Sequence, residues 1–153
     1  MIFPTRADPT YWIIPVGSDK EWSAEQVVES YVGREQIYAF RDTTHTRIHV
    51  KKGDWVCFYA AGKGTVAHAK VSSVPEKKAN SLIRDPETYP WVFNLESVDL
   101  YLNKPIVIDT ALRETLDAFK DKDLKKMWGW FVQRIHKISK HDFDVLTRSH
   151  VHC

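Results

Sequence analysis

Short apolar runs separated by turn residues dominate the pattern of this chain and predict strands. The first run, residues 11–16, is rich in aromatic and β-branched side chains and ends at Gly17. Such a run is typical of a buried strand. The same criteria predict six strands in all, at residues 11–16, 36–40, 55–60, 65–71, 91–102 and 131–138.

Turns and one long loop separate the central strands. Lys-Gly-Asp at 52–54 precedes the strand 55–60, and Gly-Lys-Gly at 62–64 closes a predicted hairpin into 65–71. Residues 72–90 contain three prolines and lack strand periodicity. Loops of this length are uncommon inside compact domains, so residues 72–90 are a candidate functional segment.

A first helix is predicted from a capping-box pattern, Ser23 with Gln26 three residues later. We expect this helix to bury its apolar face, including Tyr31, and to stop near Gly33. Asp109 is positioned to cap a second short helix, and a final helix is expected to start at residues 139–142.

Strands joined by hairpins, without a repeating βαβ rhythm, favour the α+β class. We predict a curved sheet or small open β-barrel of about six strands with peripheral short helices. The length of 153 residues fits one domain.

Positive charge is concentrated in the middle third of the chain. Residues 34–84 carry ten basic and four acidic side chains, a net charge of +6, although the whole chain carries only +2. A basic block of this kind favours a polyanionic partner, namely DNA or RNA. The alternative is a solvated basic face without a partner.

Catalytic and metal-binding patterns are weak. The chain has no Gly-rich phosphate loop and no nucleophile elbow, and Cys57 falls in the middle of an apolar strand, which favours an inert core thiol. His45 and His49, and the tail residues His150, His152 and Cys153, lack zinc-site spacing. We therefore predict no catalytic residues, no metal and no cofactor.

Composition also bounds the surroundings of the protein. Two cysteines make no disulfide framework, so a cytoplasmic location is expected. No apolar run approaches the about 18 residues that a membrane-spanning helix needs, and no signal peptide or membrane association is expected.

Aromatic residues are numerous. Of the six tryptophans, Trp12 and Trp55 are expected in the core, whereas Trp22 and Trp128 stand among polar or charged neighbours. Aromatic faces can stack on nucleobases, and nearby basic side chains can contact the phosphates. The candidate phosphate-binding residues are Arg41, Arg47, Lys51 and Lys52. Core packing beside a charged surface is the alternative reading of the same pattern.

The order of several motifs resembles the EVE-domain family, small PUA-like proteins related in fold to YTH readers of methylated adenine. The motifs that carry the likeness are Tyr-Trp-Ile-Ile at 11–14, Lys-Lys-Gly-Asp-Trp-Val at 51–56, Thr-Val-Ala-His-Ala-Lys-Val at 65–71, Glu-Thr-Tyr-Pro-Trp-Val at 87–92, Trp-Gly at 128–129 and Ile-Ser-Lys-His-Asp-Phe at 138–143. Together they span residues 11 to about 148.

The resemblance implies a partly aromatic pocket for one flipped-out, often modified, nucleobase. It implies base contacts from the end of the first strand and aromatic walls from the second strand, the long loop and the Trp-Gly motif. The implied pocket residues, with Trp22 added as a neighbouring aromatic, are Val16, Gly17, Ser18, Trp22, Tyr38, Ala39, Phe40, Tyr89 and Trp128.

These expectations define a binding module for DNA or RNA that carries a modified base. Its predicted organisation is an N-terminal extension at 1–10, an EVE/PUA-like domain at 11–148 and a tail at 149–153. The resemblance also implies a partner: relatives occur alone or attached to effectors such as restriction nucleases, so an effector protein encoded separately is a candidate partner. Two alternatives stay open: an enzyme acting on a nucleoside or RNA base through the same pocket, and a protein-interaction module.

Overall fold

The computed structural model describes residues 8–18, 21–78, 80–122 and 128–147, with the side chains of His45 and Arg47 excluded. The predicted tail at 149–153 and most of the extension at 1–10 lie outside these ranges. No helix in the described ranges is long and apolar enough to cross a membrane.

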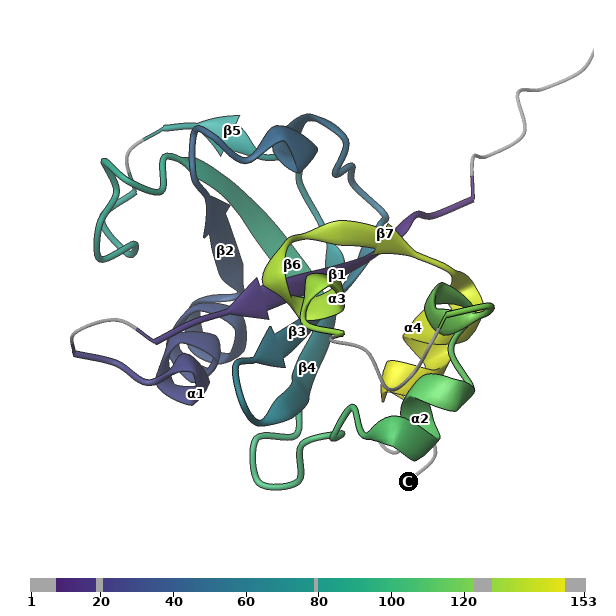
Figure 1. Cartoon of the computed structure of the whole chain (residues 1–153). Helices are drawn as coiled ribbons and strands as arrows, with labels where there is room; N and C mark the ends of the chain where they lie inside the picture. Colours follow the sequence, from purple (N-terminus) through teal and green to yellow (C-terminus); the bar gives the residue numbers. More distant parts are fainter. Residues whose placement is uncertain (1–7, 19–20, 79, 123–127, 148–153) are drawn as a thin grey trace, which may run out of the picture.

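One curled mixed sheet forms the centre of the protein (Figure 1). Six strands are hydrogen-bonded in the order β2-β6-β4-β3-β1-β7, and a short β5 pairs with β6. The strands are β1 (Tyr11–Val16), β2 (Ile37–Phe40), β3 (Trp55–Ala60), β4 (Gly64–Val71), β5 (Glu76–Lys77), β6 (Trp91–Leu100) and β7 (His136–Ile138). Only β1 and β3 pair in parallel. The predicted α+β fold with a curved sheet of about six strands is confirmed.

Short helices lie around the sheet, as predicted. They are α1 (Ala24–Val27), the π-helix η1 (Val28–Glu35), the 3-10 helices η2 (His45–Ile48) and η3 (Asp117–Phe119), α2 (Thr110–Glu114), α3 (Trp130–Gln133) and α4 (Lys140–Thr147). Both halves of the predicted capping box form, because the Ser23 side chain accepts from the Gln26 backbone and the Gln26 side chain accepts from the Ser23 backbone. Asp109 caps α2 through the Leu112 amide at 2.8 Å.

Apart from strand ends shifted by one or two residues and the short β5 within the predicted loop 72–90, two elements differ from the sequence predictions. Residues 131–138 do not form one strand: residues 130–133 make the single turn α3, which buries Phe131 between the rings of Phe119 and His136. The first helix also does not stop at Gly33. It continues to Glu35, and Gly33 instead allows close packing, since a Cβ there would lie 2.5 Å from a Leu100 side-chain carbon.

The Lys-Gly-Asp turn is fixed by the buried carboxylate of Asp54. One oxygen accepts from the Thr10 amide at 3.0 Å, and the other accepts from the Trp12 indole and the Lys51 amide, each at 3.0 Å. Trp12 therefore has a partner for its N–H inside the core, as a buried indole requires. Trp12 is in the core as expected, and Trp55 packs half-buried against the second apolar cluster, which contains Phe143.

The buried interior also contains Cys57 on β3. Its side chain is fully buried, and this burial raises the pKa of the thiol above its ordinary value of 9.0. A thiol held protonated is a poor nucleophile. The structure therefore agrees with an inert core thiol.

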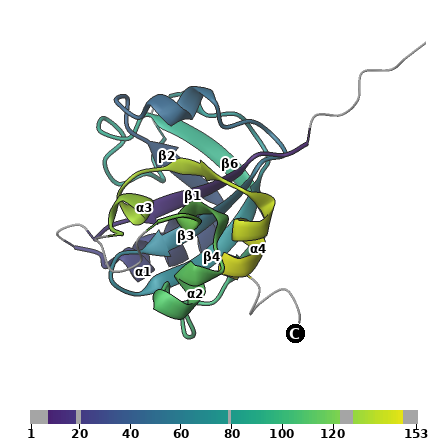
Figure 2. The ribbon, with the colours of Figure 1, turned by 45° about the vertical axis from the view of Figure 1, so that its right-hand side comes forward.

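Because the sheet is curled and open, its two edge strands, β2 and β7, have no strand partner on their outer sides within the described residues (Figures 1 and 2). β7 pairs with β1 only from Tyr11 to Ile13, so the second half of β1 also lacks a neighbour on that side. The helices α2 and α4 lie together in both views, away from β2. The opening among β1, β2 and β7 is the place where the candidate site lies.

Candidate functional site

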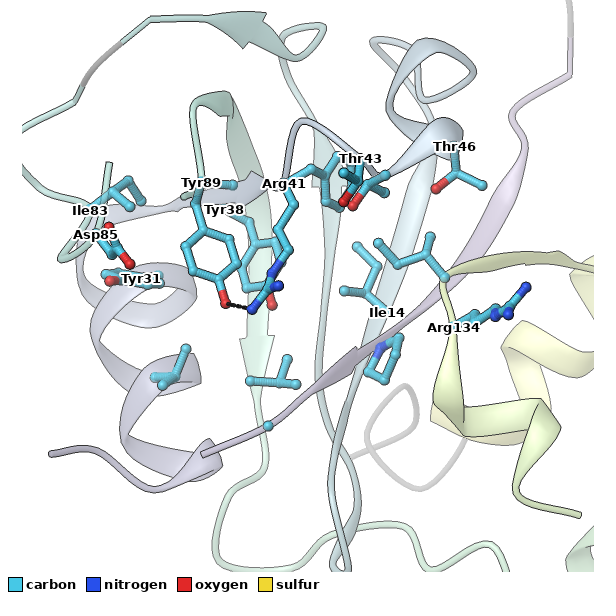
Figure 3. A pocket seen from close by; sticks show the side chains of 18 of the residues that line it. Ile14, Tyr31, Tyr38, Arg41, Thr43, Thr46, Ile83, Asp85, Tyr89 and Arg134 are labelled. Carbon is cyan, nitrogen blue, oxygen red and sulfur yellow. Dashed lines mark hydrogen bonds between the residues drawn. The ribbon is translucent and has the colours of Figure 1, made fainter. Parts of the chain in front are cut away.

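A cavity of about 890 Å³ opens at this gap in the sheet (Figure 3). This volume is in the upper part of the range of about 300–1,000 Å³ for ligand pockets. Its lining comes from the end of β1, from η1, β2 and the loop after it, from residues 83–89 and from the segment between α3 and β7. The lining residues are Ile14, Pro15, Val16, Gly17, Ser18, Val27, Tyr31, Tyr38, Ala39, Phe40, Arg41, Thr43, Thr44, Thr46, Ile83, Arg84, Asp85, Tyr89, Gln133, Arg134 and Ile135.

Three tyrosines, Tyr31, Tyr38 and Tyr89, line one side of the cavity, called the tyrosine end below (Figure 3). The ring of Tyr38 is anchored on the core, with its centroid 5.1 Å from Phe58 and 6.2 Å from both Phe40 and Phe93. None of the ring contacts in the described chain joins any two of the three tyrosines. The tyrosine end is thus an aromatic enclosure whose rings do not pack on each other.

Arg41 lies beside the tyrosine end and is bound to it. Its Nη2 donates a hydrogen bond to the Tyr89 hydroxyl at 3.1 Å, and its guanidinium carbon lies 5.2 Å from the centre of the Tyr89 ring. This hydrogen bond raises the pKa of Arg41 above its ordinary value, so the guanidinium stays charged. Arg41 therefore places a permanent positive charge next to an aromatic face.

The Tyr38 phenol stays protonated. Burial of the ring raises its pKa above the ordinary value of 10.0, and the neighbouring Tyr89 and Tyr31 add to the shift. The hydroxyl can therefore both donate and accept a hydrogen bond at neutral pH.

Residues 80–89 are tied to the first helix by Arg84. Its backbone N–H donates to the Tyr31 hydroxyl at 2.9 Å, and its Nη2 meets Glu21 at 2.6 Å. Its guanidinium also lies 4.3 Å from the ring of Trp22, which contacts Tyr31 edge-on at 5.7 Å. These contacts hold the segment that carries Tyr89 against the pocket.

In the second half of β1, backbone groups that have no partner among the described residues face the cavity. The Val16 carbonyl accepts from the Ala61 amide at 3.1 Å, on the β3 side. Because a trans peptide directs its N–H and C=O in opposite directions, the Gly17 N–H points away from β3. The Pro15 carbonyl points the same way, since the backbone groups of a strand alternate in side. A Cβ at Gly17 would meet no atom within 4 Å, so this edge is open.

Charge is unevenly distributed around the cavity. Asp85 is the single carboxylate among the lining residues, and it lies at the tyrosine end. Arg134 lies at the opposite side with Thr46, beyond Ile14; this side is called the Arg134 end below (Figure 3). The cavity thus has an aromatic end with one acid and two arginines that contact tyrosines, Arg41 and Arg84, and an opposite end with a third arginine.

The structure brings most of the sequence-predicted pocket residues into one lining. These residues are Val16, Gly17, Ser18, Tyr38, Ala39, Phe40 and Tyr89, together with the predicted phosphate ligand Arg41. Their roles toward a base or a phosphate remain predictions.

Four other predicted residues do not line this cavity. Trp22 lies behind Tyr31 under Arg84, as described above, and Trp128 packs 4.5 Å from the guanidinium of the buried Arg113. Lys51 and Lys52 lie exposed in the turn before β3. The side chain of Arg47 is outside the described part of the structure.

Sequence reasoning missed the other half of the lining. Tyr31 was assigned to a buried helix face, and Asp85 and Ile83 had no signal beyond their place in the proline-rich loop. Residues 133–135 were placed in a strand and given no role. The sequence signals for these residues are the three prolines of the long loop and the basic residue Arg134 inside the predicted strand 131–138.

One group of potential metal ligands occurs in the described ranges, away from the cavity. Donor atoms of Asp117, His141 and Asp142 lie within 4.8 Å of one another. The buried Asp142 carboxylate accepts from the Asp117 and Ala118 amides at 2.6 and 3.0 Å, and Asp117 accepts from the Ser139 hydroxyl at 2.8 Å. These hydrogen bonds explain the cluster as the anchor of α4.

Comparison with known proteins finds similarity in structure alone. No protein-family model and no curated protein matches the chain. The YTH domain of the Zygosaccharomyces rouxii MRB1 protein, solved in complex with N6-methyladenosine RNA, matches at a TM-score of 0.58 and 14% identity over 97% of this chain and 87% of that chain.

Two further solved structures have comparable scores. The YTH domain-containing protein mmi1, solved with RNA, matches at a TM-score of 0.55 and 12% identity over 94% of this chain and 80% of that chain. Protein Atu2648 from Agrobacterium tumefaciens matches at 0.56 and 14% over 92% of both chains. The chain therefore has the α+β fold of YTH domains.

Proposed function

We propose that this protein binds single-stranded RNA and encloses one modified base in the cavity, as a reader domain of the EVE type. The observation that carries the proposal is the tyrosine end: three tyrosines around one space, with a charged arginine beside them. Two solved neighbours with this fold are complexes with RNA, one of them containing N6-methyladenosine, which supports this ligand class.

In the proposed complex the base stacks in the space beside Tyr38 and Tyr89. Stacking on an aromatic side chain contributes about 1–3 kcal/mol per base. Extrusion of a base costs a few kcal/mol in a duplex and least where the base is already unpaired. Two walls are therefore enough for a single-stranded ligand, which makes single strands the preferred partner.

The open edge of β1 supplies hydrogen bonds to the base. The Pro15 carbonyl is an acceptor, and the Gly17 N–H, two residues on, is a donor. Adenine offers the complementary pair, an exocyclic N–H beside a ring nitrogen, and N6-methyladenine keeps one such N–H. The methyl group would then lie among apolar side chains of the tyrosine end, such as Ile83 and Ala39.

DNA bases have the same stacking faces, so DNA is a second ligand class to be measured in the same assay. A separately encoded effector protein is proposed as a partner that uses the bound state, on the resemblance to EVE domains alone.

Fluorescence anisotropy with labelled single-stranded RNA tests the proposal. Matched oligonucleotides carry one adenosine, one N6-methyladenosine or no adenosine, and DNA versions run in parallel. We expect the methylated RNA to bind tightest and Tyr89→Ala to weaken it about 5–150-fold, the loss of about 1–3 kcal/mol of stacking. Tyr11→Ala is the matched control, since Tyr11 is a half-buried tyrosine that packs on Phe143 outside the cavity. Equal weakening by both variants, or no binding by any oligonucleotide, contradicts the proposal.

A further inference from the structure

The cavity is larger than the space among the three tyrosines, and its two ends differ in chemistry. The tyrosine end contains the aromatic rings, Asp85 and the arginines bound to Tyr89 and Tyr31, whereas the Arg134 end contains Thr46 and a third arginine (Figure 3). A single base in the tyrosine end leaves the Arg134 end unfilled. The question is which part of a ligand the Arg134 end accepts.

Arg134 differs from the other two arginines of the lining in having no bonded partner among the described residues. Arg41 is bound to Tyr89, and Arg84 is bound to Glu21. No hydrogen bond or ion pair of the described chain involves the Arg134 side chain, although the residue lies at the cavity. The hydroxyls of Thr43 and Thr46, which also line the cavity, are likewise without a bonded partner in the described ranges.

The backbone at Arg134 is nevertheless fixed. The residue follows α3, whose Phe131 is fully buried, and precedes β7, where His136 is paired with Ile13 of β1. The His136 Nε2 also bonds the Phe131 carbonyl at 2.7 Å, across the segment that contains Arg134. Arg134 therefore carries an uncommitted guanidinium on a fixed backbone segment at the rim of the cavity, where its exposed side chain extends away from Ile14 (Figure 3).

We propose that the Arg134 end is a phosphate subsite that holds the phosphodiester on one side of the bound base. An arginine can donate two parallel hydrogen bonds to phosphate oxygens, and threonine hydroxyls commonly complete such contacts. The absence of a carboxylate among the lining residues of this end favours an anion there. The inference rests on the proposed function, because it takes the tyrosine end to be occupied by the base.

This assignment gives the ligand a direction. The base enters the tyrosine end, Arg41 lies between the two ends, and the chain leaves past Arg134 (Figure 3). It also moves the main phosphate contact away from Lys51 and Lys52, which do not line the cavity.

Phosphate replacement combined with mutation tests the subsite. The probe is a short single-stranded RNA with one N6-methyladenosine, in which either the 5′ or the 3′ phosphate of that nucleotide is replaced by a neutral methylphosphonate. We expect one of the two replacements to weaken binding to the wild type about tenfold, the lower end of what a hydrogen bond to a charged group contributes. Arg134→Gln should weaken binding of the unmodified backbone by a similar factor and should lose the response to the methylphosphonate, because the two changes remove the same contact.

Matched variants separate this subsite from the base pocket. Arg134→Gln should also lower the slope of log Kd against log salt by about 1, as expected for one lost phosphate contact. Arg34→Gln, the same change at an exposed arginine outside the cavity, should leave affinity and slope unchanged. Arg134→Lys should keep the salt slope while losing part of the affinity, since lysine keeps the charge but not the two-donor geometry.

The possible failures are distinct. If Arg134→Gln binds like the wild type while Tyr89→Ala does not, the phosphate subsite is wrong and the base pocket stands. If the methylphosphonate effect persists in Arg134→Gln, the phosphate is held elsewhere and the subsite is again wrong. If no probe binds the wild type, the proposed function fails and this inference fails with it.

Discussion

Replacing Tyr38 tests the structure of the tyrosine end without any ligand. The ring contacts Phe58, Phe40 and Phe93, and each such aromatic pair contributes about 0.5–1.5 kcal/mol beyond the area it buries. Aromatic-to-alanine changes in cores cost about 3–5 kcal/mol, and a half-buried ring belongs at the lower limit. We therefore expect Tyr38→Ala to lose about 3 kcal/mol of stability.

This loss can be measured by thermal unfolding. For a domain of this size, about 3 kcal/mol corresponds to a fall in Tm of roughly 6–12 °C. The total stability of a domain is about 5–15 kcal/mol, so the variant should still be folded at 25 °C. Tyr38→Phe is the control: it keeps all three ring contacts and removes a hydroxyl that bonds no described group, so its Tm should stay close to that of the wild type.

The outcome decides how binding data at this position are interpreted. The Tyr38→Ala change removes both a stacking surface and a support of the core. A loss of binding by this variant is therefore evidence for stacking only if binding is measured well below its lowered Tm, where the variant is folded. A Tm for Tyr38→Ala equal to that of the wild type would refute the packing on which this reasoning depends.

Three further predictions concern stability, each measured by thermal or urea unfolding. Asp54→Asn should cost about 2–4 kcal/mol of stability, because in either orientation the amide turns its N–H₂ group toward a group that donates a hydrogen bond to Asp54, such as the Trp12 indole. An unchanged stability would contradict the buried turn. Burial raises the pKa values of Cys57, Tyr38 and Tyr101 above their ordinary 9.0, 10.0 and 10.0, so the unfolded state loses protons above pH 9 that the folded state keeps. Stability should therefore fall by up to about 4 kcal/mol per pH unit, and a flat profile from pH 8 to 11 would exclude this. Gly64→Ala should cost at least about 2 kcal/mol of stability, since φ is +137° and the new Cβ would clash with the Ile106 carbonyl oxygen. A neutral effect would contradict the close approach of residue 106 to the start of β4.

Local sequence signals predicted the strands and turns well, because those signals act over a few residues. The run at 11–16, the Ser23–Gln26 capping box and the Lys-Gly-Asp turn each have a physical cause within their own segment. The segment at 131–138 has no such signal. Its apolar residues fit a helical turn as well as a strand, and the turn that forms buries Phe131 against Phe119, a contact outside the segment itself.

Only part of the site was predicted, because local sequence signals identify residues within one segment but not the contacts between distant segments. Residues of β1 and β2 carry their motif locally, but the curl of the sheet brings them to residues 133–135, about 100 positions further along the chain. Trp128 is an aromatic residue that could form a pocket wall, but its ring packs against the guanidinium of Arg113 instead. The spacing of residues along the sequence does not predict this contact. Tyr31 and Asp85 meet at the cavity because Arg84 bonds to Tyr31 and Glu21 and so holds residues 83–89 against the first helix.

A titration of isotope-labelled protein with RNA containing one N6-methyladenosine, followed by amide NMR spectra, tests the central claim most directly. Base binding in the cavity predicts shifts concentrated at Gly17 and Ser18, along β2 and in residues 83–89, with smaller shifts for the unmethylated RNA. Shifts confined to α2, α4 and the turn at 51–54, with the cavity amides unmoved, would contradict the account.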